Sequence, residues 1–249
     1  MPRTHASLPR LFVEHPLGKG AAVGLGKDQS LYLASVLRKQ LGDEVVLFNG
    51  RDGAWLGRLT STAKKSVVIE LTEQIAAQPV PANLWYGFAP LKAARLDYVI
   101  QKATEMGVST IQPVITRFTQ VSRIQLDRMR ANAIEAAEQC EVLNVPEVVA
   151  EIGLEKLLAQ WEATQGDRLL IVADEAAPSG SPIGHIAAIA GRPVGLLIGP
   201  EGGFSDDERK LLLSQPFVVP ISLGPRILRA DTAAVAALAV IQSIIGDWR

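Results

Sequence analysis

Two stretches in the last quarter of the chain combine a tight turn with charged side chains. In the first, LLIGPEGGFSDDE (residues 196–208), an apolar run is followed by a glycine-rich turn and then by a helix. This layout is typical of phosphate sites, because the N–H groups at a helix N-terminus attract anions. However, Glu201 lies in the turn, and the spacing of Ser205 and Glu208 predicts a capping box that engages those N–H groups. The glycines therefore favour close approach to a flat ligand that is uncharged or cationic.

The second stretch is ISLGPRILRADTAA, residues 221–234. It also follows an apolar strand and starts a helix, with Asp231 or Thr232 expected at the N-cap. Arg226 and Arg229 lie three residues apart beside the Gly-Pro turn. Parallel strands end at one edge of a sheet, where α/β proteins bind ligands, so both stretches could line one site. The alternative is that both are ordinary strand-to-helix connections.

The composition narrows the class of protein. A chain of 249 residues with 48% hydrophobic and 20% charged residues is typical of a soluble globular protein of one or two domains. It contains no apolar run of membrane-spanning length, and the N-terminal stretch has no secretory signal pattern. Cys140 is the one cysteine, which excludes an internal disulfide and a cysteine metal site. We therefore expect a cytoplasmic protein without a metal or a membrane partner.

The charge is unevenly distributed along the sequence. The net charge is −1, but residues 1–130 carry 17 Lys and Arg against 10 Asp and Glu, whereas residues 131–249 carry 8 against 16. The two parts therefore have balances of +7 and −8. This asymmetry indicates a basic face that meets a polyanion, with a merely solvated basic surface as the alternative.

The pattern of elements changes near residue 84. Residues 1–75 predict a small β-barrel with one helix at 29–41, whose Leu33, Val36 and Leu37 recur at helical spacing. Residues 76–83 predict a linker, and residues 84–249 predict an α/β domain with a parallel sheet. The last helix is apolar all round, so it must be buried, and a second subunit is the expected cover. The expected strands are 11–14, the hairpin 45–60, 66–73, 84–90, 109–115, 145–149, 168–174, 194–198 and 217–221, and the further helices are 96–107, 125–140 and 232–245.

Several stretches in order resemble one family. RLFVEHPLGKG, YLASVLRKQLGDEVVLFNGRDGAW, KAARLDYVIQKATEMGV and AIEAAEQC, together with LLIGPEGGFSDDE and LGPRILRADTA, resemble the ribosomal RNA small subunit methyltransferase E family of the SPOUT class. The resemblance covers essentially the whole chain. It implies an N-terminal PUA-like β-barrel that binds RNA, and a C-terminal SPOUT α/β domain with a trefoil knot near the C-terminus.

The resemblance also implies an activity. Members of the family are homodimers that use S-adenosyl-L-methionine to methylate N3 of one uridine in 16S rRNA of the small ribosomal subunit, near the decoding site. Two alternatives stay open: a non-catalytic RNA-binding ribosome-assembly factor, and a SPOUT methyltransferase that acts on another RNA. Val142 and Leu31 support the first alternative, because relatives often carry arginine and histidine, respectively, at these two positions.

The resemblance assigns roles to residues of the two loops and to basic residues elsewhere. Arg229 is expected to stabilise negative charge on the uracil oxygens, and Glu201 to accept the N3 proton or face the sulfonium. Arg226 is the second candidate for the role of Arg229, and the alternative for both arginines is pairing with Asp231 or a helix end. The alternative for Glu201 is a simple structural role in the loop turn, and the alternative for Lys102 is a local ion pair with Glu105. The expected cofactor-binding residues are Ile198, Gly199, Pro200, Gly202, Gly203, Leu223, Gly224, Ile227, Leu228, Thr232 and Ala233. The expected RNA-binding residues are Arg10, Arg38, Lys92, Arg95, Lys102 and Arg226.

Overall fold

The chain divides into two compact units in the computed structural model, which describes residues 5, 7–63, 66–120, 124–175, 177 and 182–248. Unit 1 comprises residues 1–80 and 137–145, and unit 2 comprises residues 81–136 and 146–249. The sequence assigned residues 137–145 to the second domain, whereas their contacts place them with the first unit. The backbone N–H of Phe12 donates to the Glu138 carboxylate at 2.8 Å, and Arg10 pairs with Glu141 at 3.1 Å.

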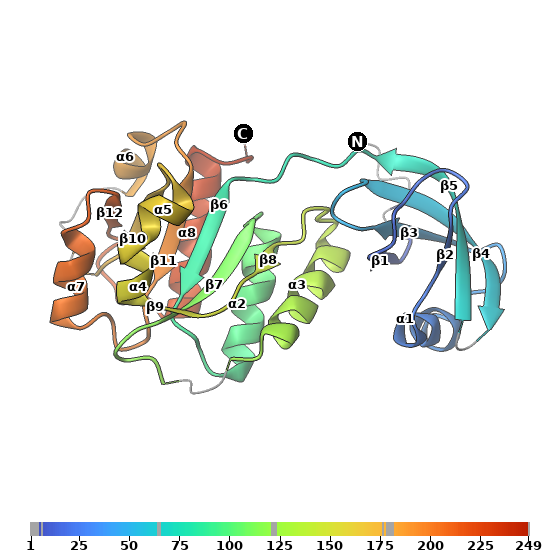
Figure 1. Cartoon of the computed structure of the whole chain (residues 1–249), viewed down its shortest axis with the longest axis horizontal. Helices are drawn as coiled ribbons and strands as arrows, with labels where there is room; N and C mark the ends of the chain where they lie inside the picture. The colour runs from blue at the N-terminus through green and yellow to red at the C-terminus, as the bar shows by residue number, and fades with distance from the viewer. Residues whose placement is uncertain are drawn as a thin grey trace. The chain divides into compact units, whose positions relative to one another are not determined.

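Unit 1 is a five-stranded sheet around an apolar core, with one helical segment (Figure 1). The strand order is β1-β3-β4-β5-β2, in which β1 pairs with β3 in parallel and the other pairs are antiparallel. The side chains of this core alternate along β5, as expected for one face of a strand, whereas β3 is buried on both faces. The elements are β1 (Arg10–Phe12), β2 (Ala22–Gly24), α1 (Lys27–Leu31), η1 (Tyr32–Val36), β3 (Glu44–Phe48), β4 (Ala54–Ala63) and β5 (Ser66–Ala76).

The expected helix 29–41 is wrong in its length and in its buried face. After α1 the chain forms a π-helical turn, in which the Leu37 N–H donates to the Tyr32 carbonyl at 2.9 Å, and Arg38 then adopts a φ of 54°. The wider π turn changes the helical period, so the residues after Leu33 rotate away from the core. Leu33 is buried, but Val36 is 65% exposed.

Unit 2 is built on a parallel sheet with the order β12-β10-β11-β6-β7-β8, and β9 also pairs with β7. Each strand expected between residues 84 and 221 is found, which confirms the α/β expectation. The elements are β6 (Leu84–Phe88), α2 (Ala93–Glu105), β7 (Thr110–Ile115), α3 (Leu126–Cys140), β8 (Glu147–Val148), β9 (Ile152–Gly153), α4 (Leu154–Ala159), α5 (Trp161–Gln165), β10 (Leu169–Ala173), α6 (Pro182–Ala187), β11 (Val194–Ile198), α7 (Asp206–Leu213), β12 (Val218–Ile221) and α8 (Ala230–Ile244).

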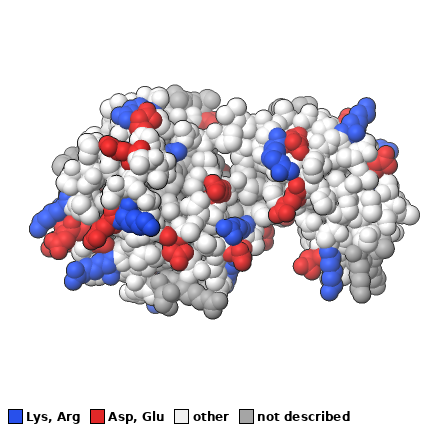
Figure 2. All heavy atoms as spheres, in the orientation of Figure 1, with Lys and Arg blue, Asp and Glu red and all other residues white. Residues whose placement is uncertain are grey.

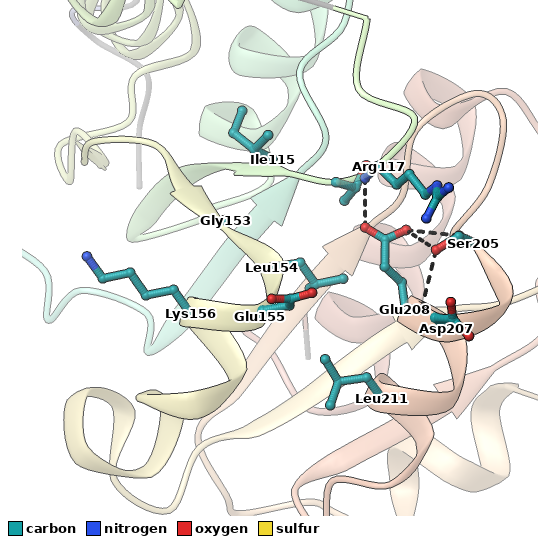
Figure 3. A pocket seen from close by; sticks show the side chains of 11 residues that line it. Ile115, Arg117, Gly153, Leu154, Glu155, Lys156, Ser205, Asp207, Glu208 and Leu211 are labelled. Atoms are coloured by element: carbon teal, nitrogen blue, oxygen red, sulfur yellow. Dashed lines mark hydrogen bonds between the residues drawn. The ribbon is translucent and has the colours of Figure 1, made fainter.

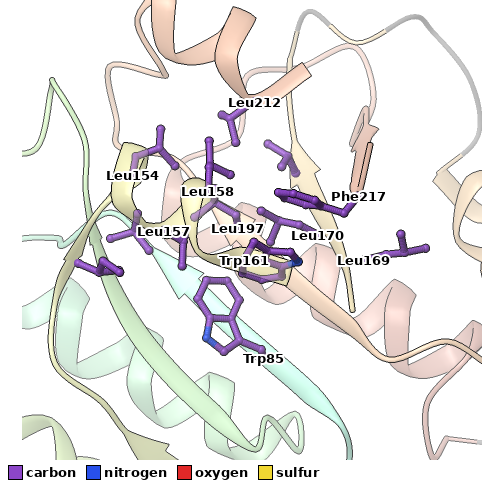
Figure 4. Close-up of a cluster of buried hydrophobic side chains, with 13 residues drawn as sticks. Trp85, Leu154, Leu157, Leu158, Trp161, Leu169, Leu170, Leu197, Leu212 and Phe217 are labelled. Atoms are coloured by element: carbon purple, nitrogen blue, oxygen red, sulfur yellow. The ribbon is translucent and has the colours of Figure 1, made fainter. Parts of the chain in front are cut away.

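An aromatic cluster fills the space between the sheet and helices α4, α5 and α7 (Figure 4). Trp161 packs edge-on against Trp85 of β6, with ring centroids 5.1 Å apart, and stacks on Phe217 at 5.7 Å. The Trp161 indole N–H donates to the Arg168 carbonyl at 2.8 Å. This core holds the ends of β10 and β11 in fixed positions, because both strands contribute buried leucines to it.

Helices α2 and α8 contact each other, and α8 also contacts β11. On α8, Ala237, Leu238 and Ile241 are buried, whereas Val235 and Val240 are half-buried. The expected burial of the last helix is therefore confirmed for one face, and a second apolar face is left partly accessible. Among the described residues, no helix is long and apolar enough to span a membrane.

Candidate active site

The two signature stretches meet at one edge of the sheet of unit 2. Strand β11 ends at Ile198 and β12 ends at Ile221, on either side of β10. Their ends are level, because Leu197 is in register with Val172 of β10 and Ile221 with the adjacent Ala173. The expectation that both loops share the carboxyl edge of the sheet is confirmed.

A cavity of about 340 Å³ lies between these loops. Leu223, Gly224, Arg226 and Thr232 do not line it. Ile227, which does line it, is 89% exposed, as expected of an apolar side chain that a ligand would cover. The predicted residues on its wall are Ile198, Gly199, Pro200, Glu201, Gly202, Gly203, Ile227, Leu228, Arg229 and Ala233, and the residues that the sequence did not indicate are Ala173, Glu175, Phe204 and Ala230.

Two glycines of the first loop are required by geometry. The ring of Phe204 covers Gly199 so closely that an added Cβ would lie 2.9 Å from it. Gly203 has a φ of 71°, and its N–H donates to the Pro200 carbonyl at 2.9 Å to close a tight turn. Residues other than glycine rarely adopt this backbone conformation. The loop therefore presents bare backbone to the cavity.

The predicted capping box at the start of α7 is confirmed (Figure 3). The Glu208 carboxylate accepts from the Ser205 N–H and hydroxyl, each at 2.9 Å, and from the Arg117 N–H at 2.7 Å. Glu208 lines a second, larger cavity of about 700 Å³ beside α7. The Glu208 N–H of α7 donates to the Ser205 hydroxyl, and the first turn of the helix is acidic, which makes this helix end a poor site for a phosphate.

Glu201 and Arg95 form an ion pair at the rim of the smaller cavity. Arg95 comes from the first turns of α2, and both side chains are partly exposed. The roles expected for these residues were separate: catalysis for Glu201 and RNA binding for Arg95. Their contact means that a carboxylate at the cavity and a cation at the surface are electrostatically coupled.

Arg229 lines the cavity and also occupies the N-cap position of α8, so the expected cap at Asp231 or Thr232 is wrong. The Arg229 guanidinium pairs with the Asp231 carboxylate at 3.0 Å, so the pairing expected as the alternative is present, and the Arg229 side chain is 58% exposed. Asp231 lies near the buried Tyr86, whose pKa is raised by burial and further by the Asp231 charge. Arg229 can therefore reach the cavity mouth while Asp231 offsets its charge.

Acidic residues also follow β10. Asp174 is buried and pairs with Arg209 of α7 at 2.9 Å, and this hydrogen bond raises the pKa of Arg209. The next residue, Glu175, lines the cavity with an exposed side chain. No motif marked this residue, because a carboxylate after a buried strand has no distinctive spacing.

The predicted RNA-binding residues have different surroundings. Lys102 is held by both oxygens of Glu105 at 2.7 and 2.8 Å, so the local ion pair expected as the alternative is present. Within the described part of the chain, exposed Lys92 and Arg226 have no ion pair, while Arg10 pairs with Glu141. Figure 2 shows basic side chains interspersed with acidic ones over the visible face, without a continuous basic patch among the residues drawn in colour. The described residues also contain no group of His, Cys, Asp and Glu suited to a metal ion.

The sequence matches a family model described as an RNA methyltransferase domain over residues 78–242, and one described as an RNA methyltransferase PUA domain over residues 25–72. The ribosomal RNA small subunit methyltransferase E of Rickettsia conorii is 32% identical over 235 residues, which are 94% of this chain and 94% of that protein. The chain belongs to the ribosomal RNA small subunit methyltransferase E family.

Other members of the family are similar to this chain over most of their length. The enzyme of the same name from Bacillus subtilis is 28% identical over 84% of this chain and 85% of its own. A crystal structure of the family member from Neisseria gonorrhoeae, bound to S-adenosyl methionine, has a TM-score of 0.85 and 28% identity over 97% of this chain and 100% of that one. The family and the PUA-like and α/β parts of the fold are confirmed, and the trefoil knot stays a prediction.

Proposed function

We propose that this chain methylates N3 of a uridine in 16S rRNA of the small ribosomal subunit, in the cytoplasm, with S-adenosyl-L-methionine as the methyl donor. The observation that carries the proposal is the cavity that the two strand-end loops share, with glycine backbone on its wall. Membership of a family of rRNA methyltransferases, one of them crystallised with this donor, supports it.

The lining fits the donor. Apolar side chains of Ile198, Leu228 and Ala233 suit an adenine ring, and the carboxylates of Glu175 and Glu201 suit a cation. When bound, the donor supplies a methyl group to N3 in exchange for the N3 proton and leaves as a neutral thioether. The nucleotide must be turned out of the RNA stack to reach this cavity.

Two side chains of this chain act on the uracil. Arg229 donates hydrogen bonds to the oxygens on which negative charge builds as the N3 proton is lost, which lowers the barrier. Glu201 accepts the proton once its carboxylate turns from Arg95 toward the base. The pairing of Arg229 with Asp231 keeps the guanidinium at the cavity mouth.

Mapping of methylated nucleotides in 16S rRNA by mass spectrometry tests the proposal. In a strain that lacks this gene, one uridine near the decoding site is expected to lose its methyl group, and the wild-type gene is expected to restore it. If that uridine keeps its methyl group while the protein binds the donor, another RNA is the substrate. If calorimetry shows no binding of the donor, the protein is an assembly factor rather than an enzyme.

Lys92 is the proposed phosphate contact that can be tested most cleanly. It is exposed at the start of α2 with no ion pair among the described residues, whereas Lys102 on the same helix is held by Glu105. Lys92→Gln is expected to lower the slope of log affinity against log salt by about one for an rRNA fragment, because one phosphate contact is lost. Lys102→Gln is the matched control, and an equal change in both slopes would contradict the assignment.

A homodimer is proposed from the second apolar face of α8. Val235, Ala239 and Val240 are half-buried on this face, in a helix that is predominantly apolar. Light scattering after size-exclusion chromatography is expected to give twice the chain mass of 26.7 kDa. Val240→Arg is expected to shift the protein to the monomer, and a wild-type protein that elutes at the monomer mass would refute the proposal.

A further inference from the structure

Glu175 is the charged residue of the cavity wall for which the described part of the chain provides no ion pair. Three charged side chains line the cavity: Glu175, Glu201 and Arg229. Glu201 is paired with Arg95, and Arg229 with Asp231. Glu175 has no ion pair within the part of the chain that the structure describes, so the cavity wall carries a net negative charge.

The Glu175 carboxylate lies over the glycine turn. A Cβ added at Gly203 would be 3.3 Å from its Oε1 atom. Gly203 and Gly199 leave the backbone bare at this point, so a ligand that rests on the loop comes within reach of the carboxylate. The cation next to Glu175 is Arg209, whose guanidinium is engaged by Asp174 at 2.9 Å.

We infer that Glu175 supplies the counter-charge for the sulfonium of the methyl donor, and thereby makes the cavity prefer the donor to its demethylated product. This inference rests on the proposed function and deepens it. Methyl transfer converts the positively charged sulfonium into a neutral thioether, so the attraction to Glu175 disappears when the reaction is complete. The charge change then favours release of the product and its replacement by a new donor molecule.

A different role for the same carboxylate would leave a different signature. If Glu175 accepted a hydrogen bond from a ribose hydroxyl or from the amino group of the methionine moiety, it would hold donor and product equally, because both contain those groups. The ratio of the two affinities therefore reports the sulfonium contact itself.

Calorimetry with three probes tests the inference. The probes are S-adenosylmethionine, S-adenosylhomocysteine and sinefungin, an analogue that carries an ammonium group in place of the sulfonium. Glu175→Gln is expected to weaken the two cationic probes about tenfold and S-adenosylhomocysteine less than about twofold. Asp206→Asn is the matched control, because Asp206 is exposed, does not line the cavity and removes the same unit of charge.

The outcomes separate this inference from the function on which it depends. A wild-type protein that binds none of the probes would overturn both the inference and the proposed function. Binding by the wild type, with equal weakening or no weakening of all three probes in Glu175→Gln, would overturn the inference and leave the function intact. A loss of preference for the cationic probes in Asp206→Asn as well would assign the effect to net charge rather than to Glu175, and would also overturn it.

Discussion

Replacing Arg229 with alanine is expected to lower the single-turnover rate of methyl transfer about 100- to 1000-fold, because one donor to the developing negative charge is lost. The Arg229 side chain makes no capping bond to α8, so alanine leaves the start of that helix intact. It is also 58% exposed, so the affinity for the methyl donor is expected to change less than about threefold. Rapid-quench assays with labelled donor measure the rate, and calorimetry measures the affinity.

Arg226 provides the control for this experiment. It lies three residues earlier in the same loop, is exposed, and does not line the cavity. Arg226→Ala is expected to keep the rate at saturating RNA within a fewfold of the wild type. If Arg229→Ala instead weakened donor binding as much as the rate, Arg229 would be a binding residue, and the proposed role in charge stabilisation would be wrong.

The fold was largely predictable where a local sequence pattern determines the secondary structure. The parallel strands of unit 2 are short apolar runs bounded by turns, and Asn49 and Gly50 mark a hairpin that the structure contains. The end of the first helix was not predictable, because the π-helical turn at 32–36 depends on packing rather than on a residue type. Nor did any local signal show that residues 137–145 pack with unit 1 through Glu138.

Only the two loops of the site were predictable from the sequence. Glycine spacing and strand ends located the cavity, since both are local features of the sequence. The ion pair between Arg95 and Glu201 joins residues from separate elements, so no spacing could indicate it. Glu175 was missed for the same reason: its place on the cavity wall, without an ion pair among the described residues, depends on the positions of other side chains.

Gly203→Val is expected to weaken binding of the methyl donor about 100-fold. At a φ of 71° a β-branched residue is strained by roughly 1–3 kcal/mol, so the turn closed by Pro200 would have to change. The added side chain would also crowd Glu175, because its Cβ would lie 3.3 Å from the Oε1 atom. Calorimetry measures the affinity, and thermal unfolding measures the cost to stability.

Gly191→Val is the control that distinguishes the effect of backbone strain from an effect on the cavity. Gly191 has a φ of 87° in the turn before β11, and no heavy atom lies within 4 Å of the position of an added Cβ. Both variants are expected to lose about 1–3 kcal/mol of folding stability, but only Gly203→Val should lose affinity for the donor. If Gly191→Val lost affinity equally, the effect would be global. If Gly203→Val bound the donor normally, the glycine turn would not contact it, and the cavity would have to serve another ligand.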